Sequence, residues 1–164
     1  MMSRLVRPLA EVEIERLVRW ADEEGWNPGI GDATAFRAAD PSGFIGAFVD
    51  GEMVAGISAI RYGLSYGFVG LYISRPDIRG QGHGKAVWQA GLARLEGRVV
   101  GLDGVDAQRD NYRAKGFVDA YRTVRYGGRL ARNVAVPSDK ALILENPNSS
   151  LLSAVVKFDR RTFP

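Results

Sequence analysis

The sequence of 164 residues contains no cysteine and only one histidine, His83. The absence of cysteine excludes disulfide bonds, thiolate metal sites and a cysteine nucleophile. A single histidine leaves almost no material for a histidine metal cluster or a Ser–His–Asp triad, so we expect no metal cofactor. A chain without cysteine is compatible with a reducing compartment, and we expect the protein to be cytoplasmic.

Long apolar runs and dense blocks of basic residues are also missing. No run approaches membrane-spanning length, and the first residues lack the apolar core of a signal peptide, so we expect no membrane partner. The formal net charge of +3 suits an anionic ligand. Arginines recur between residues 122 and 132, and we interpret them as a solvated face. No nucleic-acid partner is therefore expected, and binding through that face is the less favoured alternative.

Apolar periodicity and turn residues predict one α/β domain over residues 1–129, followed by an arm or linker over residues 130–164. Asp50 and Gly51 separate two strand-like runs, which predicts a β-hairpin. The expected strands are residues 3–7, 43–49, 52–62, 67–74, 98–102 and 117–126. The expected helices are residues 9–24, 32–39, 106–115 and a segment that ends near residue 96.

A glycine-rich stretch, RGQGHGKA (residues 79–86), lies between an apolar strand and a helical segment. Glycines let backbone N–H groups approach a ligand, and a helix N-terminus adds partial positive charge, so we predict an anion-binding turn. The spacing matches neither a P-loop nor a dinucleotide fingerprint, because Gly80, Gly82 and Gly84 alternate. It matches the acyl-CoA pyrophosphate turn, Arg/Gln-x-x-Gly-x-Gly/Ala, at every fixed position. A glycine loop without a ligand is the alternative.

This turn and the run NYRAKGF (residues 111–117) resemble the GCN5-related N-acetyltransferases, the GNAT family, over about residues 3–128. Tyr112 stands four residues before Gly116, as in the family's Y-x-x-x-G-F segment. The resemblance implies an α/β (α+β) GNAT fold, with a mixed, mostly antiparallel central sheet, splayed central strands and flanking helices. It also implies acetyl transfer from acetyl-CoA to a primary amine by direct attack in a ternary complex. A non-catalytic acyl-CoA-binding sensor is the alternative.

The resemblance further implies which residues form the site. Tyr112 would be catalytic and protonate the departing CoA thiolate, while backbone N–H groups of residues 71–73 would stabilise the oxyanion. The expected cofactor-binding residues are Leu71, Tyr72, Ile73, Arg79, Gly80, Gln81, Gly82, His83, Gly84, Lys85, Asn111 and Lys115. The family's usual asparagine, about seven residues before the tyrosine, is replaced here by Val105. Asn111 therefore either binds the pantetheine arm or caps its own turn.

The expected partner is a small-molecule or peptide amine, and the chain is expected to act alone or as a homodimer. Loops near residues 23–32 and 62–66 are the expected acceptor-binding segments. Residues 20–29 and 101–117 look like the first domain of tandem two-domain acetyltransferases, and residues 157–164 resemble the opening of their second domain. Residues 130–164 are thus either an arm or the approach to a second domain.

Overall fold

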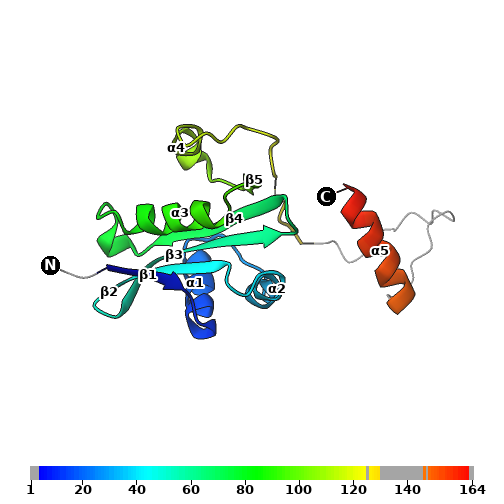
Figure 1. The fold of residues 1–164 in the computed structure, drawn as a ribbon, viewed down its shortest axis with the longest axis horizontal. Helices are drawn as coiled ribbons and strands as arrows, with labels where there is room; N and C mark the ends of the chain where they lie inside the picture. The colour runs from blue at the N-terminus through cyan, green and yellow to red at the C-terminus, as the bar shows by residue number, and fades with distance from the viewer. Residues whose placement is uncertain (1–3, 125, 130–145, 147, 163–164) are drawn as a thin grey trace. The chain divides into compact units, whose positions relative to one another are not determined.

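The computed structural model describes residues 4–124, 126–129, 146 and 148–162 (Figure 1). The chain divides into two compact units, Met1–Val118 and Asp119–Pro164. The first unit contains the sheet and four of the α-helices, and the second contains one helix in its described part. The domain boundary predicted at residue 129 falls inside the second unit.

The first unit mixes strands and helices, as the sequence predicts, with two helices after the first strand and three successive strands before the third α-helix. The strands are β1 (Arg4–Pro8), β2 (Phe44–Val49), β3 (Glu52–Tyr62), β4 (Tyr66–Ser74) and β5 (Val99–Leu102). The helices are α1 (Glu11–Glu23), α2 (Asp32–Ala39), α3 (His83–Arg94) and α4 (Arg109–Arg113), with short 3-10 turns at Pro76–Ile78 and Asp106–Gln108.

The sheet has five strands in the order β1-β2-β3-β4-β5, and its first three pairs are antiparallel. Only β4 and β5 run parallel, and their pairing covers Tyr66–Val99 through Val69–Leu102. β4 continues for five more residues, Gly70 to Ser74, without β5 beside it. The predicted mixed sheet with splayed strands and the predicted β2–β3 hairpin are therefore confirmed.

Helices cover both faces of the sheet, α1 and α2 on one and α3 on the other (Figure 1). On the α1 face, Ile14, Leu17 and Ala21 recur at helical spacing and are buried against Phe44 and Ile73. On the other face, the side chains of Val87, Trp88 and Leu95 from α3 pack on the strands. Burial of these stripes is the main term that holds the layers together.

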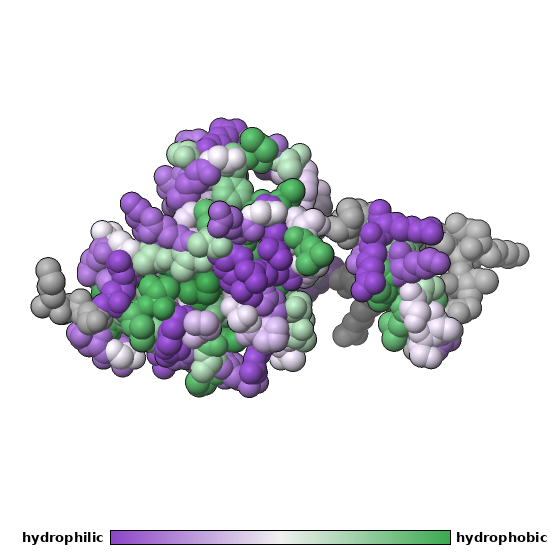
Figure 2. Space-filling model, viewed as in Figure 1, coloured by the Kyte–Doolittle hydropathy of each residue, from purple (hydrophilic) through white to green (hydrophobic). Residues whose placement is uncertain are grey.

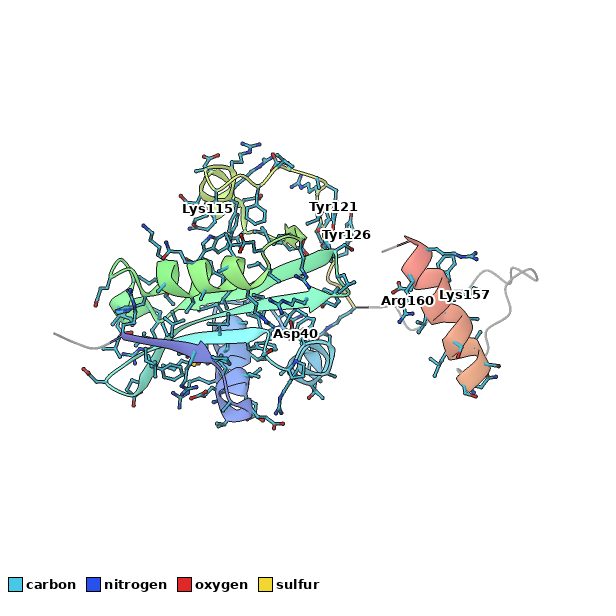
Figure 3. All side chains as sticks on the ribbon, viewed as in Figure 1. Asp40, Lys115, Tyr121, Tyr126, Lys157 and Arg160 are labelled. Carbon is cyan, nitrogen blue, oxygen red and sulfur yellow. The ribbon has the colours of Figure 1, made fainter. Side chains whose placement is uncertain are left out.

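A buried ion pair ties the two layers together at one end of the sheet. Asp40, which follows α2 (Figure 3), lies only 7% exposed and pairs with the Arg94 guanidinium at the end of α3. The same carboxylate accepts the Arg61 backbone N–H at 2.9 Å, and Arg61 Nε donates to the Arg94 carbonyl at 3.0 Å. One buried carboxylate thus links α2, β3 and α3.

Glu13 gives α1 a pH-sensitive start. Its carboxylate accepts the Ala10 N–H at 2.7 Å and both terminal nitrogens of Arg7 at 2.7 and 2.8 Å. The hydrogen bonds from Arg7 are the main reason that the pKa of Glu13 falls below its usual 4.5. A carboxyl whose folded-state pKa is lowered stabilises the fold above the unfolded pKa, and this contribution is lost as pH falls through the folded pKa.

Glu13→Gln is therefore expected to flatten the acid limb of stability. Urea unfolding of the wild type should lose free energy as pH falls from 4.5 towards the lowered pKa, and the variant should lose less. Glu15→Gln, an exposed carboxyl on the same helix, is the matched control and should follow the wild type. A Glu13→Gln variant with the full wild-type acid loss would contradict this assignment.

Two expectations about single elements need correction. Residues 117–124 form no strand, although their composition predicts one. Val118 and Tyr121 remain more than 80% exposed, and strand preference depends on packing against neighbours that these side chains lack. The predicted helix 106–115 is divided into a 3-10 turn and the short helix α4.

The second unit contains α5 (Ser149–Thr162) within the segment predicted to be an arm or linker. Asn148 caps it, since its Oδ1 accepts the Leu151 N–H at 2.9 Å. Apolar and charged side chains share this helix, so Figure 2 shows it partly hydrophobic and partly hydrophilic. Residues 130–145 lie outside the described residues.

Candidate functional site

A β-bulge in β4 marks the centre of the candidate site. Gly70 pairs with Ser58 and Ile73 pairs with Gly56, so two residues of β4 stand opposite the single residue Ile57. Leu71 adopts a left-handed φ of +45°, which is uncommon for a side chain of this size. A bulge takes its extra residue out of the hydrogen-bonded ladder. Backbone groups of residues 71–72, which sequence analysis assigned to cofactor binding, therefore lie where the ladder is interrupted.

The bulge also changes the face to which β4 side chains point. Val69 packs in the α3-side cluster, whereas Leu71 and Ile73 pack in the α1-side cluster. Tyr72 returns to the α3 side and lies 5.1 Å from the Trp88 ring, measured between ring centroids. The interrupted ladder lies directly beyond the last β4–β5 pair, Val69–Leu102. The bulge in β4 therefore begins where the pairing of β4 with β5 ends, so backbone groups of β4 have no partner in β5 at this place.

The glycine turn leads from β4 into α3, as predicted. Gly80 and Gly82 adopt left-handed φ angles of +81° and +82°, and Gly82 is the residue that caps α3. A Cβ on Gly80 would meet no atom within 4 Å, so its glycine is required by conformation and not by crowding. A Cβ on Gly84 would lie 2.7 Å from Ser74 Oγ, so a larger residue there would force this side chain to shift. The α3 N-terminus therefore starts tightly against β4 with its amides outward.

The charged side chains around this turn come from three parts of the chain. Arg79 donates from Nε to the Ser74 carbonyl at 3.0 Å and forms an ion pair with Glu24 at the end of α1. Arg4, on β1, donates to the Gly82 carbonyl at 3.4 Å, a contact that sequence analysis missed. Its signal is weak, since 78 residues separate the two partners.

Two predicted residues at the turn have no assigned contact here. Gln81 is exposed between the two left-handed glycines. His83 opens α3, and its Nδ1 is buried without a hydrogen-bond partner among the described residues.

Tyr112 lies in a cluster of aromatic rings on the α3 side. Its ring centroid is 5.8 Å from that of Trp88 and 6.4 Å from that of Phe117. Gly104 leaves room for the ring, because a Cβ there would collide with it. Partial burial raises the pKa of the Tyr112 phenol above its ordinary value. The pKa of the Tyr72 phenol is also raised, mainly by burial and further by the charge of Tyr112.

A cavity of about 490 Å³ brings several predicted residues together. Tyr72 comes from β4, Lys85 from α3, and Lys115 from the turn after α4 (Figure 3). Lys115 Nζ lies 4.7 Å above the Trp88 ring, a cation–π contact. The remaining lining residues are Trp88, Gln89 and Leu92. These three were not predicted from the sequence, although residues 85, 88, 89 and 92 share one face of a helix.

Asn111 lies outside this cavity. Its Nδ2 donates to the Gln108 side chain, at Oε1, at 2.6 Å, and its role in cofactor binding stays a prediction. The described residues contain no group of acidic or histidine side chains able to hold a metal ion. Within the same described part, no helix is long and apolar enough to cross a membrane.

The arrangement fits a long ligand with an anionic middle and an apolar arm. The α3 N-terminus and the left-handed glycines offer N–H groups to an anion. The cavity offers apolar walls with two ammonium groups, and the bulge offers backbone groups to a polar atom such as a carbonyl oxygen. Acyl-CoA combines a pyrophosphate, an extended arm and a thioester carbonyl, so the residues present fit this group.

The sequence pattern that defines the Acetyltransferase (GNAT) family matches residues 11–121. A holothin acyltransferase from Pseudoalteromonas sp. (strain SANK 73390) is 32% identical over 155 residues. This alignment covers 94% of the chain and 51% of the relative, so the chain spans about half the length of that protein.

Solved structures share the fold. An acetyltransferase of the GNAT family from Xanthomonas campestris gives a TM-score of 0.61 at 24% identity, over 77% of this chain and 95% of that chain. A predicted acetyltransferase from Clostridium acetobutylicum, solved with acetyl-CoA, gives 0.58 at 18% identity, over 76% and 96%. Acyl-CoA is the co-substrate typical of this family. With the family pattern covering more than half of its residues, the chain belongs to the GNAT acetyltransferase family.

Proposed function

We propose that this chain is an N-acyltransferase that moves an acetyl group from acetyl-CoA to a primary amine in a ternary complex. One observation carries the proposal above the others. One continuous stretch, from β4 through the turn into α3, contains the bulge and the left-handed glycines. The cavity lined by Tyr72 and Trp88 lies along the same stretch. The proposed catalytic domain is residues 1–129.

Different residues of this stretch would bind the phosphates, the arm and the acyl carbonyl of acetyl-CoA. Amides of residues 80–85 bind the pyrophosphate at the start of α3. Lys85 and Lys115 line the cavity, where their ammonium groups balance the negative charge of the CoA phosphates. Backbone N–H groups of residues 71–73 orient the acyl carbonyl and stabilise the negative charge that develops on its oxygen. When bound, acetyl-CoA supplies the thioester whose carbonyl carbon the amine attacks.

Tyr112 is the proposed general acid for the leaving thiolate. Its pKa is raised by burial, so the phenol keeps its proton throughout the neutral and mildly alkaline range. An ordinary phenol, with a pKa of about 10, matches the basicity of a thiolate, and the raised pKa makes Tyr112 a weaker acid that remains protonated until the thiolate departs. Because the acid form is lost only above the ordinary phenol value, the profile of kcat against pH should show no alkaline decline from Tyr112 below about pH 10.

The acceptor is proposed to be a small amine of the kind that the relative's name specifies. The relative is a holothin acyltransferase, and holothin is therefore the first acceptor to test. The α1–α2 loop packs Trp26 against the cluster that contains Leu71, which gives this side of β4 an aromatic and apolar character. The alternative is a non-catalytic acyl-CoA sensor, which would use the same turn but no acceptor.

An acceptor screen tests the proposal. Thiol release from acetyl-CoA would be followed with holothin, amino acids, polyamines, aminoglycosides and peptide N-termini, and the acylated product confirmed by mass. Thiol release that depends on one class of amine supports the transferase. Tight acetyl-CoA binding without product from any amine would favour the sensor instead.

A further inference from the structure

An ion pair links the glycine turn to the loop on the opposite side of β4. The Arg79 guanidinium, at the head of the turn, contacts the Glu24 carboxylate across 55 residues of sequence. Its Nε is held by the Ser74 carbonyl at 3.0 Å. Among the described residues, Nη1 of Arg79 has no hydrogen-bond partner. The residue expected to meet a phosphate is thus already engaged by a carboxylate.

Glu24 stands at the base of the α1–α2 loop. It caps the C-terminus of α1, with its backbone N–H bonded to the Trp20 and Asp22 carbonyls. The chain then turns through Gly25, at a φ of +75°, and Trp26 packs in the cluster that includes Leu71 of the bulge. Glu24 therefore stands two residues before a loop side chain, Trp26, that packs against the same cluster as Leu71.

Charge decides how this pair responds to a ligand. A pyrophosphate at the turn brings more negative charge than one carboxylate, and both compete for the same guanidinium. The Glu24 and Arg79 side chains are 32% and 50% exposed, so water can replace either partner at low cost. Arg79 contacts Glu24, so an anion that binds the same guanidinium competes with this carboxylate.

We infer that Glu24 and Arg79 form a latch that couples phosphate binding at the turn to release of the α1–α2 loop. This inference rests on the proposed binding of acyl-CoA at the turn. Because coupling is reciprocal, an acceptor that needs the released loop also strengthens acyl-CoA binding. Glu24 is a positioning residue here, since it acts on the cofactor only through Arg79.

Calorimetric titration with CoA is the first test. Glu24→Gln removes the carboxylate that competes with the phosphates for Arg79 and is expected to tighten CoA binding about threefold to fivefold, the scale of one exposed ion pair. Glu23→Gln removes the same charge from the exposed neighbouring position and should change the affinity less than twofold. In an Arg79→Gln background, Glu24→Gln should have no effect. Equal effects of both glutamine variants, or weaker binding by Glu24→Gln, would overturn the latch.

Hydrogen–deuterium exchange of residues 24–31 is the second test, and it needs no turnover. CoA should raise exchange in this loop of the wild-type protein, whereas Glu24→Gln should show the raised exchange without CoA. Unchanged exchange in a protein that binds CoA would refute the latch alone. Absence of CoA binding by the wild type would instead refute the proposed function.

Discussion

Replacing Tyr112 by phenylalanine is expected to lower kcat by about 100-fold or more, with little change in acyl-CoA affinity. The change removes the hydroxyl that protonates the leaving thiolate, and it keeps the ring that packs against Trp88 and Phe117. A lost transition-state proton transfer lowers kcat and kcat/KM together and leaves ground-state binding intact. Steady-state kinetics with the acceptor found in the screen measure both quantities.

Tyr72→Phe is the control that identifies the proton donor. Tyr72 lines the cavity, has a pKa raised by burial, and packs on Trp88, as Tyr112 also does. If Tyr112 is the acid, Tyr72→Phe should retain most of the wild-type kcat. A large loss in Tyr72→Phe with wild-type kcat in Tyr112→Phe would transfer the role to Tyr72. Wild-type kcat in both variants would refute catalysis by either of the two phenols that pack on Trp88.

Removing the buried carboxylate of Asp40 is expected to produce the largest loss of stability. Asp40→Ala would leave the Arg94 guanidinium, whose side chain is 15% exposed, without its ionic partner. It would also leave the Arg61 backbone N–H without an acceptor. Breaking one partner of a buried ion pair typically costs about 3–5 kcal/mol. Urea unfolding at neutral pH measures this difference.

An exposed ion pair provides the comparison. Asp77 pairs with Arg75 at 2.5 Å, yet its side chain is 59% exposed, so Asp77→Ala should unfold close to the wild type. The double variant with Asp40→Ala and Arg94→Leu removes both buried charges and should be more stable than Asp40→Ala alone. An Asp40→Ala protein as stable as Asp77→Ala would show that the buried pair does not hold the layers together.

Local sequence signals predicted most of the fold and the glycine turn at the candidate site. Asp50-Gly51 specified the β2–β3 hairpin, and the alternating glycines specified the turn before α3. Both features depend on backbone conformations that few residue types adopt, so composition alone reveals them. The strand predicted at residues 117–126 was wrong over 117–124, because strand formation depends on packing that composition does not report.

Long-range contacts could not be predicted in the same way. Leu71 carries no local signal for a left-handed φ, and the bulge depends on the register in which the rest of β4 pairs with β3. The partners of Arg79 and Arg94 lie 55 and 54 residues away in sequence, so only the fold brings them together. The helical spacing between Lys85 and Trp88 predicts that they share a face of α3. That this face lines a cavity follows only from the fold, which brings Lys115 over the Trp88 ring.

Titration of the wild type with CoA, compared with Gly82→Ala and Gly97→Ala, tests the central claim most directly. Both glycines adopt left-handed φ angles, +82° and +78°, and neither Cβ would meet an atom closer than 4.0 Å. The two variants therefore carry similar backbone strain of about 1–2 kcal/mol, but only Gly82 belongs to the anion-binding turn. The wild type should bind CoA, Gly82→Ala should bind about tenfold more weakly, and Gly97→Ala should match the wild type. A wild type that does not bind CoA, or equal weakening by both variants, would contradict the assignment of this turn to the cofactor.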